Sequence, residues 1–407
     1  MNKLKVETHR GRAGIACVWP LLALAAATLA CASLGAPAAT PPPAQPTLPA
    51  PVIWRVPAGN SVITPPALAD GLLVYLTSES QVIAVDAATG AQKWSQSLNV
   101  SNDAHRPLAV TNGVVFADDT VLDNIGTDRH EVVALDLHTG AILWQTPQSP
   151  AANAFFLYPP VAANAVVYYE SETGPGGRQL TAADARTGNV YWQSPFTGTA
   201  LAGDPAIDGA LLYVPIDHAA AADSNSFTTD LVGLDATTGA RRWLVEMGSL
   251  AAHILAAGGG KVFATTADGT CWAIDGSTGQ VAWKFKFDDS QPAPPLLAGD
   301  TLYFGDSQGR LYALDAATGA KRWVATVGRN LWRRPAVAGG RVYIGTSDGY
   351  LAALEAASGS VVWKTQNPQV VPFANSPYIP PVDTEPVAAG GTLYFFRPDD
   401  LMALRIP

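Results

Sequence analysis

The stretch ALDAATGAKRW, residues Ala313 to Trp323, decides the fold because its pattern recurs along the chain. Each copy has an apolar pair, an acidic residue, two mostly small residues, Thr or Ser, a Gly, and a Trp four positions after that Gly. Self-similarity at a period of about 40–50 residues is the signature of a repeat architecture. The acidic residue and the Trp of the seven copies are Asp86 and Trp94, Asp136 and Trp144, Asp184 and Trp192, Asp235 and Trp243, Asp275 and Trp283, Asp315 and Trp323, and Glu355 and Trp363.

Each copy predicts two strands joined by a tight turn. An alternating apolar strand such as residues 311–314 ends at the acidic residue, whose carboxylate caps the turn, and the Gly supplies a positive φ. The next strand carries the Trp, a large flat side chain suited to packing between neighbouring sheets rather than to binding a ligand. Upstream lie another apolar strand, such as residues 342–345, and a short one introduced by proline, such as residues 335–337. Four strands per period form one propeller blade.

The sequence predicts eight such blades. Trp243, Trp283, Trp323 and Trp363 are spaced by 40 residues, and Trp54 precedes the next Trp by the same interval. Residues 392–397 and 401–405 supply two late strands without a following turn, whereas residues 52–56 have the character of a fourth strand. We therefore predict an all-β, eight-bladed β-propeller of four-stranded antiparallel blades over residues 52–407. Pairing of the N- and C-terminal strands closes the ring and removes exposed sheet edges.

The repeat at Ala313–Trp323 resembles the pyrroloquinoline-quinone-like (PQQ-like) repeat family, and the resemblance covers about residues 52–407. That family includes quinoprotein alcohol dehydrogenases and outer-membrane assembly lipoproteins, and this chain is similar to the latter in layout. The resemblance implies an envelope protein that binds another protein. Quinoprotein enzymes carry an adjacent-cysteine disulfide under the cofactor, whereas the cysteines here are separate: Cys17, Cys31 and Cys271. The repeat is specific for the fold and uninformative about activity.

The N-terminal residues have the composition of an export signal. Four basic residues among the first twelve precede an apolar stretch over residues 15–30, so residues 1–31 are predicted to be a signal. The sequence Thr-Leu-Ala before Cys31 resembles a lipobox, which makes Cys31 the lipidation candidate, with ordinary signal-peptidase cleavage as the alternative. Residues 32–51 are rich in Ala and Pro and are predicted to be a linker. We expect a periplasmic or outer-membrane protein, lipid-anchored if Cys31 is modified.

Charge and residue usage exclude several function classes. With 25 basic and 34 acidic residues the net charge is −9, which argues against nucleic acid and anionic lipid as partners. Only Cys271 falls in the predicted folded body, so neither an internal disulfide nor a Cys-x-x-Cys-His haem site is expected. The six histidines show no metal-ligand spacing, and no catalytic motif occurs. We predict no metal site, no resident cofactor and no catalytic residue.

Insertions break the repeat on one side of the predicted ring. Because strands in a blade alternate in direction, connections between second and third strands share one face with the inter-blade loops, here called the long-loop face. The Asp-Gly turns occupy the opposite face, here called the turn face. Loops on a rigid scaffold carry binding function, so the long-loop face is predicted to hold the site. The insertions fall at residues 118–130, 170–179, 215–230 and 366–385.

Residues just before the innermost strand of each blade are predicted to ring the channel mouth on the long-loop face. Trp332 beside Arg333 and Arg334 stands out, because an aromatic ring and two guanidiniums suit an anionic or planar group. The alternatives are a polar funnel of mutually paired residues and a salt bridge at the rim. The candidate binding residues are Arg106, Tyr158, Asp204, His253, Trp332, Arg333, Arg334 and Glu385.

Three functional hypotheses follow. The first is a non-enzymatic envelope scaffold that binds a protein partner through the long-loop face, and the resemblance points to the outer-membrane barrel assembly complex as that partner. The second is an enzyme or sensor that holds PQQ with Ca²⁺, or another small anion, through the arginines and Trp332 of the channel mouth. The third is a carbohydrate-binding propeller, suggested by the loop aromatics Phe155, Phe156 and Tyr378.

Overall fold

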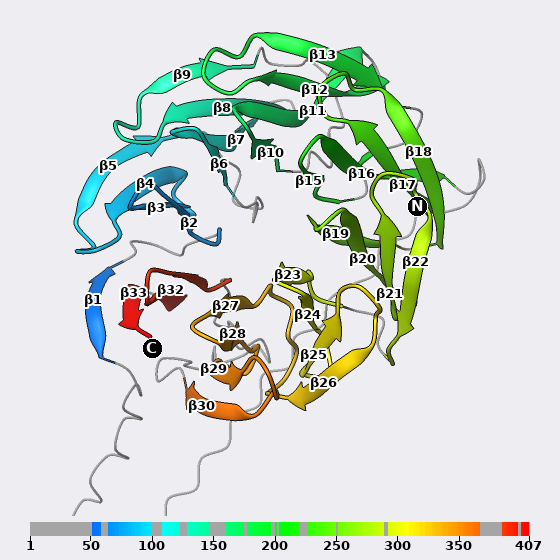
Figure 1. Cartoon of the computed structure of the whole chain (residues 1–407). Coiled ribbons are helices and arrows are strands. Elements are labelled where there is room, and N and C mark those ends of the chain that lie inside the picture. The colour runs from blue at the N-terminus through cyan, green and yellow to red at the C-terminus, as the bar shows by residue number, and fades with distance from the viewer. Residues whose placement is uncertain are drawn as a thin grey trace, which may run out of the picture. The chain divides into compact units, whose positions relative to one another are not determined.

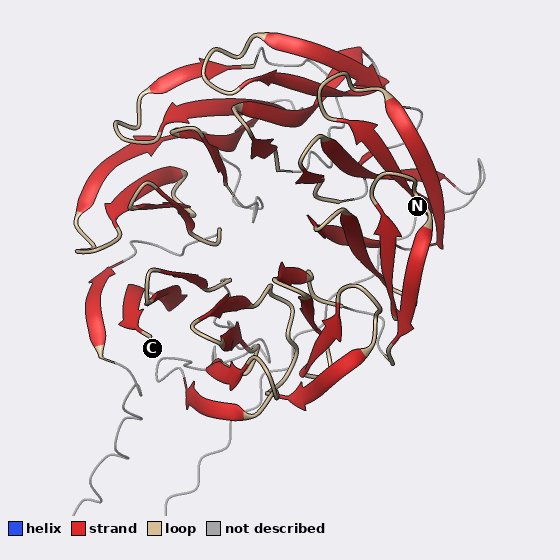
Figure 2. Cartoon of the chain, viewed as in Figure 1, coloured by secondary structure: helices blue, strands red, loops and turns tan. Residues whose placement is uncertain are grey.

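The computed structural model shows eight β-sheets arranged as blades around a central axis (Figures 1 and 2). Every regular element in the described residues is a strand, which confirms the predicted all-β, eight-bladed propeller. The predicted signal, residues 1–31 with Cys31, and nearly all of the predicted linker lie outside the described residues. The structure describes residues 51–57, 64–98, 108–122, 128–146, 159–174, 177–196, 200–201, 203–219, 227–249, 251–288, 292–366, 385–397 and 400–406.

The innermost strand of each blade lines the channel. In seven blades it has only three residues, mostly Ala, Val and Leu, and these small side chains let eight strands approach one axis. In order from blade one to blade eight, the innermost strands are β2 (Ala67–Ala69), β6 (Ala109–Thr111), β10 (Val161–Ala163), β15 (Ala206–Asp208), β19 (Ala251–Gly258), β23 (Leu296–Ala298), β27 (Ala336–Ala338) and β31 (Val387–Ala389).

The second and third strands are the buried centre of each blade, because both of their faces pack against neighbouring blades. Every side chain of Thr301–Gly305 is buried, and the sequence is accordingly a nearly continuous apolar run. The second strands are β3 (Leu72–Leu76), β7 (Val114–Leu122), β11 (Val166–Gly174), β16 (Leu211–Ala219), β20 (Lys261–Thr266), β24 (Thr301–Gly305), β28 (Arg341–Gly345) and β32 (Thr392–Arg397). The third strands are β4 (Gln81–Asp86), β8 (Asp128–Asp136), β12 (Gly177–Asp184), β17 (Phe227–Asp235), β21 (Thr270–Asp275), β25 (Arg310–Asp315), β29 (Tyr350–Glu355) and β33 (Asp400–Arg405).

The outermost strand of each blade forms the rim and buries mainly its Trp. In the outermost strand of blade six, for example, Trp323 is buried while its neighbours Arg322 and Val324 are exposed. The Trp lies opposite a small residue of the third strand, Ala313 in this blade. The outermost strands are β5 (Gln92–Ser97), β9 (Ile142–Gln145), β13 (Val190–Pro195), β18 (Arg241–Ser249), β22 (Val281–Lys286), β26 (Lys321–Thr326), β30 (Val361–Gln366) and, for blade eight, β1 (Val52–Pro57).

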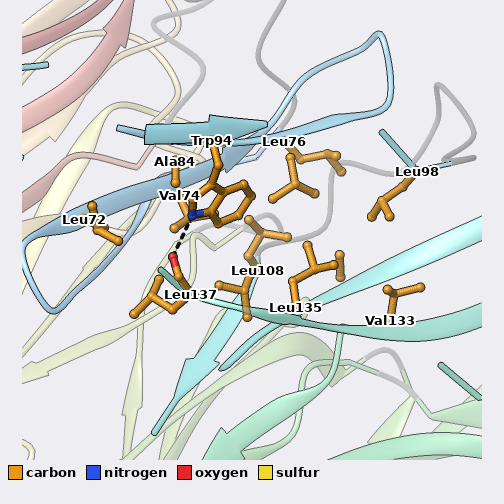
Figure 3. Close-up of a cluster of buried hydrophobic side chains, with 13 residues drawn as sticks. Leu72, Val74, Leu76, Ala84, Trp94, Leu98, Leu108, Val133, Leu135 and Leu137 are labelled. Carbon is orange, nitrogen blue, oxygen red and sulfur yellow. Dashed lines mark hydrogen bonds between the residues drawn. The ribbon is translucent and has the colours of Figure 1, made fainter. Parts of the chain in front are cut away.

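In every blade but the seventh, the Trp of the outermost strand fastens its blade to the next one, in a contact here called the tryptophan latch. The Trp94 indole Nε1 donates a hydrogen bond to the Leu137 carbonyl in the turn of blade two, at 2.8 Å (Figure 3). Gly140 of that turn has φ +73°, and a Cβ there would lie 2.6 Å from the Trp94 ring, so the ring itself requires Gly. The predicted packing role of the tryptophans is thus confirmed. The latch bonds join Trp54 to Ala87, Trp94 to Leu137, Trp144 to Ala185, Trp192 to Ala236, Trp243 to Gly276, Trp283 to Ala316 and Trp323 to Ala356.

The acidic residue of the repeat caps its own turn. One carboxylate oxygen of Asp315 accepts hydrogen bonds from the backbone N–H groups of Ala317 and Thr318, at 3.1 and 2.9 Å, and from the Thr318 hydroxyl at 2.8 Å. A side-chain hydrogen bond from Arg322, with those from Thr318, lowers the pKa of Asp315 to about 2. The predicted turn chemistry therefore accounts for these residues without a bound metal.

The two ends of the described chain close the ring. β1 pairs antiparallel with β33, with Trp54 opposite Ala403 and Val56 opposite Leu401, as predicted. The Arg55 guanidinium Nε donates to the buried Asp400 carboxylate at 2.7 Å across the same pair. Because Val52 lies opposite Leu404, near the end of a third strand, the chain enters the propeller on the turn face.

Blade four adds a fifth strand to the predicted four. β14 (Ala200–Leu201) pairs with β16 beside β15, so that Leu201 lies opposite Ile216. β16 has nine residues, and the innermost strand covers only Leu211–Tyr213 of its edge. An uncovered sheet edge has backbone N–H and C=O groups without partners, and β14 pairs with part of the uncovered edge of β16.

Candidate functional site

Long hairpins distinguish blades two, three and four. Their second and third strands have eight or nine residues, against five or six in blades five to seven. The insertions at residues 118–130, 170–179 and 215–230 are thus mainly paired strand, because cross-strand pairs such as Asp217 with Thr229 continue the ladder. All three hairpins join second to third strands and therefore extend on the long-loop face. Most of the insertion at residues 366–385 lies outside the described residues.

A buried ion pair stiffens the hairpin of blade three. The Arg178 Nη1 donates to the Glu170 Oε1 at 2.6 Å, and the two side chains are 12% and 0% exposed. Tyr168 and Leu180, on the same face of this sheet, pack in the cluster between blades three and four. The ion pair therefore continues that interface toward the long-loop face.

A second charged pair lies on the facing hairpin of blade four. The His218 Nε2 is 3.0 Å from the Asp230 carboxylate, and both side chains are part-buried. Ile216 and Val232, two residues along, belong to the same interface between blades three and four. Toward the long-loop face, the interface between blades three and four is thus polar. Nearer the turn face it consists of aliphatic and aromatic side chains.

Two adjoining cavities occupy the channel at the long-loop face. One has a volume of about 440 Å³ and reaches β2, β23, β27 and β31, and the other, of about 410 Å³, reaches β6, β10, β15, β19 and β23. Leu108, Leu296, Leu297 and Arg334 line both. Most of the other lining residues are Ala, Val and Pro, so the first cavity is largely apolar, whereas the second presents polar and apolar surface in similar measure. The polar funnel of mutually paired residues therefore stays an open alternative. The volumes of both cavities are within the range of small-molecule sites.

Arg334 is the one residue of basic type that lines these cavities among the described residues. Its backbone N–H donates to the Glu385 Oε1 at 3.3 Å, which ties the start of β27 to the start of β31. Its side-chain Nε is buried and has no hydrogen-bond acceptor among the described residues. Glu385 lines the first cavity and Asp204 the second, so each cavity has an acidic residue in its wall.

The loop before Arg334 is held by both neighbouring blades. The Leu331 side chain is fully buried, and its N–H donates to the Asp306 carbonyl at 2.8 Å. On the other side, the Ser347 N–H donates to the Arg329 carbonyl at 3.0 Å. Trp332 follows directly and is 40% exposed. The structure thus presents an exposed indole on a fixed backbone, two residues before Arg334.

The structure places only part of the predicted ring. Trp332 and Arg333 lie on the held loop, and Arg333 makes an interaction of its own. His253 lies inside β19 rather than before it, because this innermost strand begins at Ala251, and its side chain is outside the described set. Arg106 and Tyr158 lie outside the described residues, as do the loop aromatics named for carbohydrate binding.

Asp306 forms a polar network that sequence reasoning missed. Its buried carboxylate accepts from the Arg310 Nε at 2.6 Å, from the Arg310 N–H at 2.8 Å and from the Tyr312 hydroxyl at 3.2 Å. Burial, with the charge of Asp306, raises the pKa of Tyr312 to about 12. The sequence pattern that could have predicted this network is Asp306 four residues before Arg310, with the turn residue Gly309 between them. The network closes the short hairpin of blade six on the long-loop face.

Other chemistry is sparse in the part of the chain that the structure describes. No three His, Cys, Asp or Glu side chains there converge as a metal site would require. Cys271 is buried, and burial raises the pKa of its thiol. Within the same ranges, no helix is long and apolar enough to cross a membrane.

Comparison with known proteins identifies one family. The family model described as "Outer membrane protein assembly factor BamB" matches residues 50–174, 129–226 and 176–394. A BamB from Burkholderia pseudomallei (strain K96243) is 35% identical over 97 residues, which are 24% of this chain and 24% of that protein. The chain thus spans about a quarter of the length of the curated relatives it matches.

Solved structures share the fold. BamB from Moraxella catarrhalis aligns with a TM-score of 0.52 at 23% identity, covering 75% of this chain and 83% of that chain. A europium-containing methanol dehydrogenase aligns with a TM-score of 0.58 at 16% identity, covering 78% of this chain and 80% of that chain. At these identities the likeness concerns the fold alone.

Proposed function

Since the chain belongs to the BamB family of outer membrane protein assembly factors, we propose that it is a non-enzymatic scaffold of the cell envelope. It binds a protein partner through the long-loop face. Because the family is that of outer membrane protein assembly factors, the outer-membrane barrel assembly complex is the partner to test first. The observation that carries this proposal is the clustering of three long hairpins on consecutive blades of one face.

The hairpins offer what a protein interface needs. In their described parts the strands are paired, and Arg178 with Glu170 holds the hairpin of blade three. The hairpin of blade four has polar side chains such as His218 and Asp230, which lie next to the apolar cluster between blades three and four. Mixed surfaces on paired strands bind partners at a small ordering cost. The opposite face repeats the same turn in every blade but the eighth, which gives a partner few distinguishing features.

Shortening one hairpin tests the proposal. Residues 170–179 are replaced by GDSQGR, the sequence of Gly305–Arg310, which forms the short hairpin of blade six. This exchange removes Glu170 together with Arg178, so no buried charge is left unpaired. We expect binding to the purified, detergent-solubilised barrel assembly complex to weaken at least about tenfold, because hot spots concentrate interface energy.

A matched exchange controls for folding and for the face. Residues 266–270 of blade five are replaced by DSQGR, which keeps the length of a hairpin that is already short. This variant should bind like the wild type. If the wild-type protein itself does not bind the complex, the assembly role is refuted. If both variants bind as tightly as the wild type, the hairpin of blade three is not part of the contact.

The N-terminus extends the proposal to location. We propose that residues 1–31 direct export and that Cys31 carries a lipid. Because β1 enters the propeller on the turn face, an anchor upstream of it leaves the long-loop face free for a partner. Mass spectrometry of the mature N-terminus tests this: a diacylated Cys31 supports it, and an unmodified N-terminus beyond Cys31 contradicts it.

A PQQ-binding role is the second candidate, favoured by Arg334 in the channel and by the exposed Trp332 two residues before it. The described residues fit this cofactor poorly, since no carboxylate cluster there could hold Ca²⁺ and a single arginine lines the cavities. Titration of the purified protein with PQQ and Ca²⁺, followed by absorbance and dye-linked alcohol oxidation, distinguishes the candidates. A saturable absorbance change would favour the quinoprotein role.

A further inference from the structure

Arg334 differs from the other half-buried arginines of the propeller. Arg178 and Arg310 each lie 2.6 Å from a carboxylate oxygen, Glu170 and Asp306 respectively. The Arg334 guanidinium has no carboxylate within ion-pair distance among the described residues, and its Nε is buried without an acceptor. A buried donor without an acceptor destabilises the folded state. Arg334 therefore brings to the two cavities a donor that no described residue satisfies.

The local backbone prevents Arg334 from leaving this position. Leu331 is anchored between two blades, and Pro335 follows Arg334 directly. The Glu385 carboxylate holds the Arg334 backbone N–H rather than its guanidinium. The backbone that carries the guanidinium is thus fixed at the junction of the two cavities, and a fixed backbone lowers the entropy cost of binding.

The surroundings define the chemistry of the missing acceptor. The planar guanidinium pairs with a carboxylate through two parallel hydrogen bonds. Leu108, Leu296 and Leu297 line both cavities, so the rest of the ligand is apolar. Glu385 and Asp204 in the walls of the two cavities disfavour a second negative charge on the ligand.

We propose that the two cavities form one site for an apolar monocarboxylate. The carboxylate pairs with Arg334, and the apolar tail lies along the leucines of the channel wall. Two sources share this chemistry: a free acyl carboxylate, and the C-terminal carboxylate of an apolar peptide. The site is independent of the scaffold role, because it concerns the channel and not the hairpin tips.

Calorimetric titration of the purified, exported protein tests the site. The probes are sodium octanoate, octylammonium chloride, and the N-acetylated peptide Ala-Ala-Leu-Phe with a free or an amidated C-terminus. Saturable binding of octanoate but not of octylammonium is expected for a free acyl ligand. Binding of the free peptide but not of the amide indicates a peptide C-terminus as the source. If neither octanoate nor the free peptide binds, the proposal is overturned.

Two variants locate the binding. Arg334→Met keeps the length and the apolar stem and should weaken carboxylate binding at least about tenfold, as expected for a lost charge-assisted hydrogen bond. Arg405→Met is the matched control, since Arg405 is exposed at the opposite end of a third strand and should not affect binding. Circular dichroism and the thermal midpoint confirm that both variants fold. Equal binding by Arg334→Met, or equal loss in Arg405→Met, overturns the assignment. Because no partner protein is present, failure here leaves the scaffold proposal untouched.

Discussion

Blades five to seven and blades two to four are built from one repeat and differ at one end only. In both groups the Trp of one blade bonds to the turn of the next, as Trp192 does with Ala236 and Trp323 with Ala356. At the long-loop face, blades five to seven close their hairpins within a few residues, whereas blades two to four extend them. The repeat therefore fixes blade packing at the turn face. Variation is confined to the face where a partner can reach it.

The largest expected effect tests whether the tryptophan latch is the same in both groups. Trp192→Ala and Trp323→Ala each remove a ring that packs between two blades and a hydrogen bond to the next turn. We expect each to lower the free energy of unfolding by about 3–5 kcal/mol. Urea denaturation followed by tryptophan fluorescence measures the loss. A loss below about 1 kcal/mol in only one variant would show that the two groups of blades are held differently.

The partner side of the latch gives a matched test. Gly359 has φ +72°, and a Cβ there would lie 2.6 Å from the Trp323 ring. Gly359→Ala should therefore destabilise the protein although it removes no atom. Gly340, which has a similar φ of +72° but no atom within 4 Å of a Cβ, is the control for backbone strain alone. An equal loss in both variants would contradict the role of the ring contact.

The next effect concerns the long hairpins alone. Arg178→Met leaves the buried Glu170 without its cation, and we expect the free energy of unfolding to fall by about 2–3 kcal/mol. The double variant Glu170→Leu/Arg178→Met should regain most of this loss, because an apolar pair of similar size needs no charge partner. Removing the exposed Arg322 of blade six should cost much less. If the double variant is as unstable as Arg178→Met, the loss comes from packing and not from the charge.

These cases show which features could be predicted from the sequence. The turn and its Trp lie within eight residues of each other, so their spacing predicted both the blade and its packing. Glu170 and Arg178 pair only because a hairpin of a particular register brings them together. The Arg334 N–H and the Glu385 carboxylate are 51 residues apart in the sequence. Their contact depends on how all eight blades close into a ring, which a local pattern does not predict. The predicted positions of Arg106 and Tyr158 stay predictions.

A smaller effect, shared by both groups of blades, appears at acid pH. Side-chain hydrogen bonds from Arg242 and Arg322 lower the pKa of Asp235 and Asp315 to about 2, below the ordinary value of 3.8. A carboxylate with a lowered folded-state pKa stabilises the protein above its unfolded pKa and loses this contribution as the pH falls through the folded value. We expect the thermal midpoint to be constant above about pH 5 and to fall between about pH 4 and pH 2.

Asparagine variants separate the groups of blades in this acid response. Asp184, in the turn of blade three, also has a lowered pKa, chiefly through the Thr187 hydroxyl. Asp184→Asn and Asp315→Asn should each reduce the acid sensitivity of the midpoint by a similar small amount. A midpoint that does not change between pH 5 and pH 2 in the wild-type protein would contradict the role of these turns.

The smallest expected change in stability is at Trp332. Its indole is 40% exposed and lies on a loop held by the buried Leu331, so Trp332→Ala should change the free energy of unfolding by less than about 0.5 kcal/mol. Leu331→Ala, one position earlier, should cost about 2–4 kcal/mol because it empties a filled space between two blades. An exposed Trp on a fixed loop contributes little to the free energy of folding. Trp is nevertheless among the residue types most enriched in the hot spots of protein interfaces. Trp332→Ala should therefore weaken binding of the barrel assembly complex while the thermal midpoint stays constant. If Trp332→Ala leaves binding unchanged, the contact is restricted to the hairpins of blades two to four. If it greatly lowers the free energy of unfolding, Trp332 serves packing between blades and not binding.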